Sequence, residues 1–155
     1  SDEVRSNPIG VVCGSFEINV RYALEESGNW LKDVTIDPET ELSFNATVGN
    51  PGDVPQESIG GIPGAGWCNL ASRYAQVVRT LGLSDQDIHF DRDSQNLGAG
   101  QENNVLIWNI GGYPGFEGDR HDLVISNHTG QWIHMWAVDD GNGHVSIVGR
   151  LERRT

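Results

Sequence analysis

Cys68 is the residue of this chain whose position most favours covalent chemistry. A glycine-rich stretch, residues 60–66, leads into it, and residues 69–81 have the apolar spacing of an amphipathic helix that Gly82 ends. Backbone N–H groups and the helix dipole at such a start stabilise a thiolate, which is the reactive form of cysteine. The pattern therefore predicts a site where the loop meets the helix.

A nucleophilic thiol also requires a base beside it, and that base is usually a histidine. His89 and His134 are the candidates, and we take His89 with Cys68 as the predicted catalytic pair. Two other interpretations of the thiol stay open. It could be buried on the apolar face of the helix, since cysteine is among the residues most often buried. It could also form a disulfide with Cys13, the second cysteine of the chain.

A second candidate site is a row of aromatic side chains near the C-terminus. In the segment Trp132-Ile-His134-Met-Trp136, strand alternation places the two tryptophans and the histidine on one face and the apolar residues on the other. An exposed row of this kind can stack on sugar rings or receive an apolar side chain of another protein. Trp67, next to Cys68, is a further candidate binding residue. The alternative is a central strand that is buried on both faces.

Metal binding has weaker support in the sequence. Residues 91–102 partly match a calcium-binding loop. The matching oxygen ligands, at positions 1, 3, 5 and 12 of the loop, are Asp91, Asp93, Gln95 and Glu102. The sixth position is Asn96 instead of glycine, so a solvated polar loop is the favoured interpretation. No pair of histidines has the spacing of a zinc site. We therefore expect no cofactor, with calcium at this loop as the one exception.

The composition is that of a single globular domain with an acidic surface. The 155 residues include 22 acidic and 10 basic side chains, which gives a net charge of −12. Such a surface repels phosphate backbones and anionic membranes, so nucleic acid is not an expected partner. No apolar run reaches the roughly 20 residues that a membrane helix needs, so we expect no direct membrane insertion by this segment. The polar first residues resemble an interior cut, which indicates a soluble piece of a longer protein.

The candidate residues need a scaffold of helices and strands to position them. Helices are predicted over residues 15–28 and 69–81, with extended or irregular chain over 29–42 and a polar loop over 85–104. Strands are predicted over residues 42–45, 105–110, 122–127, 131–138 and 144–152. Helices first and hairpins last favour an α+β fold. We expect two main helices packed on a mostly antiparallel sheet that ends in a three-stranded C-terminal meander.

The succession of these segments resembles the VanW-like domain of bacterial cell-envelope proteins. The resemblance covers most of the chain, about residues 15–150. It is carried by short pieces in the family's order: Asn19-Val-Arg21, Leu42-Ser43-Phe44-Asn45, Val48-Gly49, Gly64-Ala65-Gly66-Trp67-Cys68, Leu81-Gly82-Leu83, Asp122-Leu123 and Asn127-His128-Thr129-Gly130. It implies an N-terminal extension over residues 1–14 and one VanW-like domain over residues 15–155. At the thiol the chain departs from the family, because Gly-Ala-Gly-Trp-Cys-Asn replaces the usual Gly-Gly-Gly-Ile-Cys-Gln.

The resemblance implies a cellular location and does not imply a particular reaction. The family is associated with the bacterial cell envelope and with peptidoglycan, and it has no settled biochemical activity. We therefore expect an extracytoplasmic domain that binds cell-wall glycan or peptide, or an envelope protein. The alternative is a cysteine-dependent hydrolase or transferase acting on peptidoglycan-like peptides, with Cys68 as the nucleophile and His89 as the base. A structural spacer is the third hypothesis.

Overall fold

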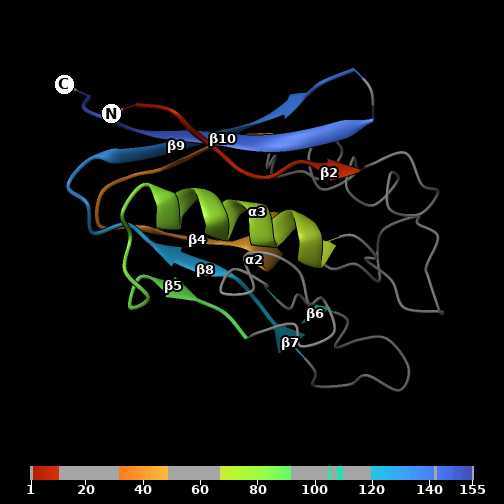
Figure 1. Ribbon diagram of the computed structural model, residues 1–155. Coiled ribbons are helices and arrows are strands. Elements are labelled where there is room, and N and C mark those ends of the chain that lie inside the picture. The colour runs from red at the N-terminus through yellow and green to blue at the C-terminus, as the bar shows by residue number, and fades with distance from the viewer. Residues whose placement is uncertain are drawn as a thin grey trace.

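In the part of the chain that it describes, the computed structural model of this protein places one long helix between a large and a small antiparallel sheet (Figure 1). The structure describes residues 2–10, 32–48, 67–91, 105, 108–109, 120–141 and 143–154. Within these ranges the large sheet, helix α3 (Trp67–Thr80) and the small sheet form three successive layers. The two chain ends lie close together at one edge of the large sheet, where the first and last strands pair.

The large sheet consists of antiparallel pairs throughout. Its order is β1 (Val4–Arg5), β10 (His144–Glu152), β9 (Trp132–Asp139) and β3 (Asp33–Ile36), and β2 (Ile9–Gly10) pairs with the other end of β10. β9 and β10 form a long hairpin, and its turn contains Gly141 and Gly143 at φ of 77° and 82°. Glycine adopts these angles without strain, so the turn residues help to set the register of the hairpin.

A small sheet and a two-stranded ribbon lie on the other side of α3 (Figure 1). Leu42, Ile125 and Ile88 are opposite one another in the register of the small sheet, and their row joins the core beneath α3. The small sheet has the order β4 (Glu41–Ser43), β8 (Val124–Ser126) and β5 (Ile88–His89), and the ribbon pairs β6 (Trp108–Asn109) with β7 (Arg120–His121).

Helix α3 is buried around most of its circumference because it lies between the two sheets. Its buried side chains are Trp67, Leu70, Ala71, Ser72, Tyr74, Ala75, Val77 and Val78. The helix approaches β10 closely at Gly149, where an added Cβ would lie 2.6 Å from Val77 Cγ1. Gly149 therefore sets the spacing between this helix and the sheet. The helix predicted over residues 69–81 is confirmed, and it begins slightly earlier, at Trp67.

The strand expected over residues 42–45 is wrong beyond Ser43. β4 ends there, and helix α2 (Phe44–Val48) begins. Ser43 caps this helix, since its Oγ accepts a hydrogen bond from the N–H three residues later at 3.1 Å. The carboxylate of Asp122 accepts a second one from the N–H of Asn45 at 2.9 Å. An acceptor from a distant segment thus completes the helix start, and the local residue pattern does not contain it.

The α+β class is confirmed, whereas the described strands do not form the expected three-stranded C-terminal meander. β9 and β10 make the predicted hairpin, but β8 pairs with β4 and β5 in the small sheet. The chain leaves the small sheet after Ser126 and enters the large sheet at Trp132, so the intervening turn is a crossover between sheets. The first predicted helix, residues 15–28, and the glycine-rich stretch, residues 60–66, lie outside the described residues.

Two further segments differ from the expectation. Residues 4–5 and 9–10, expected in an N-terminal extension, form β1 and β2 of the large sheet. β5 forms within the expected polar loop, because buried Ile88 pairs with Ile125 of β8. Of the strand predicted over residues 105–110, the structure describes the first residue and β6. Neither helix in the described ranges has the length and apolar character needed to cross a membrane.

Candidate functional site

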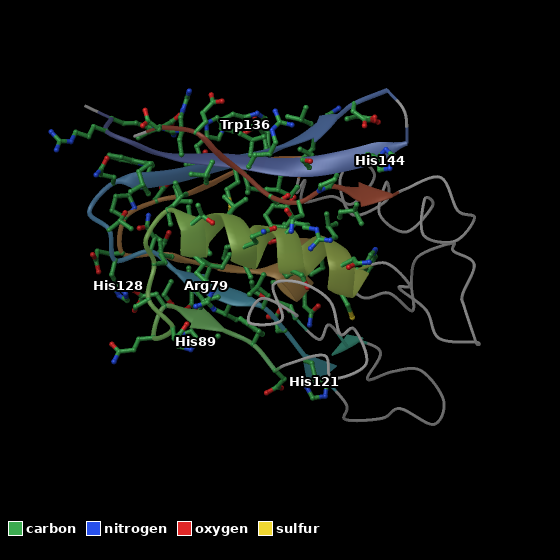
Figure 2. All side chains as sticks on the ribbon, in the orientation of Figure 1. Arg79, His89, His121, His128, Trp136 and His144 are labelled. Atoms are coloured by element: carbon green, nitrogen blue, oxygen red, sulfur yellow. The ribbon has the colours of Figure 1, made fainter. Side chains whose placement is uncertain are left out.

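The outer face of the large sheet carries a row of large side chains on the side away from α3, where Figure 2 labels Trp136. Burial alternates along β9. Ile133 and Met135 are fully buried in the core, and Trp132, His134 and Trp136 are half-buried on the opposite face. The predicted alternation of this strand is therefore confirmed, and β9 is fully buried on one face only.

Side chains from both neighbouring strands border this row. Paired residues of an antiparallel ladder point to the same face. Asp33 of β3 and two residues of β10, Arg150 and Glu152, therefore share the outer face with the row. We call the whole set the aromatic face: Asp33, Trp132, His134, Trp136, Arg150, Glu152 and Arg154.

His134 is held between two carboxylates, one from each neighbouring strand. Its Nδ1 lies 2.9 Å from Oε2 of Glu152, and its Nε2 lies 2.7 Å from Oδ1 of Asp33. Both ring nitrogens therefore face carboxylate oxygens, which accept hydrogen bonds. The His134 ring centroid is 4.7 Å from that of Trp136, with the planes tilted by 45°. These contacts fix the imidazole in the middle of the aromatic face.

Glu152 contacts three side chains of the aromatic face: His134, Arg150 and Arg154. Its Oε2 accepts a hydrogen bond from Nε of Arg150, and its Oε1 accepts one from Nη2 of Arg154, both at 2.6 Å. The hydrogen bonds from Arg154, Arg150 and His134 lower the pKa of Glu152 to about 2. The carboxylate therefore stays ionised at neutral pH and anchors both guanidinium groups.

Both anchored arginines lie over tryptophan rings. The guanidinium carbon of Arg150 is 5.4 Å from the centroid of Trp136, and that of Arg154 is 6.0 Å from the centroid of Trp132. Both distances are within the range of cation–π attraction. The alternation along the strand predicts the aromatic row, whereas these arginines are not among the predicted binding residues. A signal was present, since Arg150, Glu152 and Arg154 recur at every second position, as side chains on one face of a strand do.

No protein-family model, curated protein or solved structure matched the chain.

The structure does not bring Cys68 and its predicted bases together. Cys68 is half-buried in the first turn of α3. His89 is exposed on β5, and Figure 2 places it below the C-terminal half of the helix. His134 lies on the far face of the large sheet, with both ring nitrogens bound to carboxylates. Cys13, the other predicted partner of the thiol, lies outside the described residues.

Trp67 belongs to the core. Its side chain is 1% exposed, and its ring meets Phe44 edge-on with 6.4 Å between centroids. Phe44 contacts Tyr74 in the same way, and burial raises the pKa of the Tyr74 hydroxyl. Edge-on contacts of this kind stabilise aromatic clusters inside proteins. Trp67 is therefore not part of the aromatic face, and we leave it out of the binding surface proposed below.

A hollow of about 540 Å³ lies beside β5 and β8. Its lining includes His89 and three carboxylates, those of Asp85, Asp91 and Asp122. Each carboxylate has a partner within the protein, and the partners are, in that order, Arg79, His121 and Ser43. The charges of this hollow are thus bound internally, so we do not assign it a ligand.

The predicted calcium loop begins at this hollow. Asp91 is described, and its Oδ2 lies 2.6 Å from Nδ1 of His121. The rest of the loop, residues 92–102, is outside the described residues. In the described part of the chain, no group of three or more histidine, cysteine, aspartate or glutamate side chains is arranged to hold a metal ion.

Proposed function

We propose that this domain binds cell-wall glycan in the bacterial envelope and that the aromatic face is its binding surface. The observation that carries the proposal is the row of Trp132, His134 and Trp136, which retains exposure to solvent on a five-stranded sheet. Aromatic rings give large, rigid contact areas with a polar end, which suits stacking against sugar rings. The location outside the cytoplasm comes from the resemblance to the VanW-like domain and is part of the same proposal.

The row suits a chain of sugars better than a single ring. Trp132 and Trp136 are four residues apart on β9, so their Cα atoms are separated by roughly 13 Å at the rise of an extended strand. A ligand that crosses both rings makes two stacking contacts at once. β9 is paired on both sides, with β10 and β3. The rings are therefore held in place before binding, which lowers the entropy that binding costs.

An envelope protein is the competing partner for this surface. Protein interfaces place apolar residues at their centre, and charged residues are depleted there. On the aromatic face, charged groups lie directly over or beside each ring, as Arg150 does at Trp136 and Arg154 at Trp132. A ligand rich in hydroxyl groups uses both the rings and the adjacent hydrogen-bonding groups, so glycan is the better fit.

Co-sedimentation with insoluble peptidoglycan tests this proposal. We expect Trp136→Ala to weaken binding about fivefold, because an aromatic contact is worth on the order of 1 kcal/mol. Phe90→Ala is the matched control, since it removes a partly buried aromatic ring that lies beside β5. The control should bind like the wild type. Unchanged binding by a folded Trp132→Ala/Trp136→Ala variant, verified by circular dichroism, would contradict the proposal.

The cysteine-dependent reaction has less support. In the described part of the chain, neither His89 nor His134 forms a hydrogen bond with Cys68. We expect Cys68→Ala to sediment with peptidoglycan as the wild type does, and the wild type to release no peptides from it. Release of peptides by the wild type, with none released by Cys68→Ala, would instead favour the hydrolase.

A further inference from the structure

Building on the glycan-binding function proposed above, we infer that the glycan is acidic and that Arg150 and Arg154 bind its carboxylate groups. Three features of the aromatic face carry this inference: the distribution of charge in the chain, the N–H donors that the two arginines retain, and the way Glu152 holds them.

The basic residues of this acidic chain gather around the aromatic face. The chain has 10 basic residues and a net charge of −12. Five of the basic residues lie on or next to β1, β3 and β10: Arg5, Lys32, Arg150, Arg153 and Arg154. Arg5 is opposite Val148, which is opposite Trp136, so it points to the same face. An anionic ligand is therefore repelled less at this face than at the acidic remainder of the surface.

Arg150 and Arg154 retain N–H donors for a ligand. A guanidinium group has five N–H donors. Arg150 uses Nε for Glu152 and Nη1 for Glu3, the latter at 3.4 Å. Arg154 uses Nε and Nη2 for Glu152, and its Nη2 also donates to Oγ1 of Thr35 at 3.4 Å. Within the described residues, Nη2 of Arg150 and Nη1 of Arg154 have no hydrogen bond. The two side chains are 41% and 43% exposed, so these donors are accessible from solvent.

The acidic groups of the face offset its basic groups, since Glu3 also pairs with Arg150, so the face is close to neutral on a strongly acidic protein. Glu152 already accepts hydrogen bonds from both arginines, and Asp33 is bound to His134. Glu152 is a positioning residue, because it holds each guanidinium over its tryptophan ring. A sugar that packs against the exposed part of the ring, next to the guanidinium, then brings its carboxylate to the remaining N–H groups. Charge-assisted bonds of this kind are about twice as strong as neutral ones.

A pair of matched glycans tests the inference. The first is soluble peptidoglycan strands freed of peptide, in which every second sugar carries a lactyl carboxylate. The second is the same strands after reduction of those carboxyl groups to alcohols. Isothermal titration with the wild-type protein should show at least tenfold tighter binding of the acidic strands. The difference should shrink as salt is raised, because salt screens charges exposed to solvent.

Substitutions test whether Arg150 and Arg154 cause the tighter binding of the acidic strands. Arg154→Gln and Arg150→Gln should each weaken binding of the acidic strands by about fivefold or more and leave binding of the reduced strands nearly unchanged. Arg153→Gln is the matched control. Arg153 is exposed and directly precedes Arg154, so this substitution removes one positive charge next to the proposed binding residues. It should reduce binding of the acidic strands by less than twofold.

The outcomes separate this inference from the function on which it rests. Equal binding of the two glycans overturns the acidic specificity and leaves glycan binding intact. Binding of neither glycan overturns both proposals. A loss in Arg153→Gln as large as that in Arg154→Gln means that net charge alone attracts the ligand, and this result overturns the assignment to Arg150 and Arg154.

Discussion

Asn127 donates its side-chain N–H to the carbonyl oxygen of Ile36 at 2.8 Å, across 91 positions of sequence. The same amide nitrogen donates to the carbonyl oxygen of Gln131 at 2.7 Å. Residues 37–40 and 127–131 are the two connections by which the chain crosses between the sheets. Asn127 is 1% exposed, so its amide joins both crossovers from a buried position.

Asn127→Ala is expected to lower the free energy of unfolding by about 3 kcal/mol, because it removes the buried donor to the carbonyl oxygen of Ile36 and the acceptor of two hydrogen bonds from Thr129. Urea denaturation followed by tryptophan fluorescence measures the change. Asn7→Ala is the control, because Asn7 is exposed, and it should stay within about 0.5 kcal/mol of the wild type. A loss below about 1 kcal/mol in Asn127→Ala would mean that this amide does not hold the crossovers together.

Gly149→Ala tests the close approach of α3 to β10. The new Cβ would lie 2.6 Å from Val77 Cγ1 and 3.0 Å from Met135 Cγ, and overpacking of this kind costs about 1–3 kcal/mol. Adding Val77→Ala removes the nearest clashing atom. The double variant should therefore lose less stability than the sum of the two single losses, as a double-mutant cycle measures. If the two single losses of stability simply add in the double variant, the cost of Gly149→Ala does not come from the contact with Val77.

Glu152→Gln should destabilise the protein at pH 6 by an amount that shrinks as the pH falls toward 2. The pKa of Glu152 in the folded protein is about 2, below its usual 4.5. Its ionised contacts therefore stabilise the fold above about pH 4.5, and this contribution is lost as the pH falls through about 2. Urea midpoints of variant and wild type between pH 2 and 7 give the difference.

Glu41→Gln is the control for that series. Glu41 is exposed on β4, at the edge of the small sheet, and its side chain forms no ion pair within the described residues. Glu41→Gln should therefore destabilise the protein less at pH 6 than Glu152→Gln does. A constant difference for Glu152→Gln would argue against the anchoring of Arg150 and Arg154 by an ionised carboxylate.

His128 gives the opposite dependence on pH. Its Nδ1 is 2.8 Å from Oδ1 of Asp87, and this hydrogen bond and charge, together with the charge of Glu39, raise the pKa of His128. The imidazolium therefore stabilises the fold fully below the unfolded pKa of about 6.5, and the stabilisation is lost as the pH rises through the higher folded pKa. His128→Gln should lower the melting temperature at pH 5.5 and leave it nearly unchanged at pH 9.

His89→Gln serves as the control, because His89 is exposed and forms no ion pair with the described part of the chain. Its melting temperature should follow that of the wild type at both pH values. An equal loss at pH 5.5 and pH 9 in His128→Gln would mean that the charge of His128 does not stabilise the fold.

The elements that the sequence predicts correctly are those with a local cause. The spacing of Leu70, Tyr74 and Val77 gives α3 an apolar stripe, and the glycines after Asp140 end one strand of a hairpin and begin the next. The aromatic row follows from the alternation along β9, which is a property of any extended strand. These periodicities depend on residues close together in the chain.

The sequence also leads to errors, and each has a distant cause. β8 has the composition of a meander strand, yet it pairs with β4 and β5. The chain then crosses to the other sheet at Asn127, whose amide donates to the distant carbonyl oxygen of Ile36. α2 replaces part of a predicted strand because Asp122 supplies an acceptor for its first turn. Cys68 and His89 suggested a catalytic pair, but the fold places them on different elements at different ends of α3.

The sequence by itself determined which side chains alternate between the two faces of a strand and where the chain turns. It also determined that two tryptophans and a histidine share one face of a strand. Only the tertiary structure decided which strands border that face. Hydrogen-bonded pairing between β9 and β10 brings Arg150 and Glu152 beside His134, and pairing with β3 brings Asp33 from the other side. Periodicity fixes the direction of a side chain, whereas its neighbours across a sheet depend on register and strand order, which arise from contacts far apart in sequence.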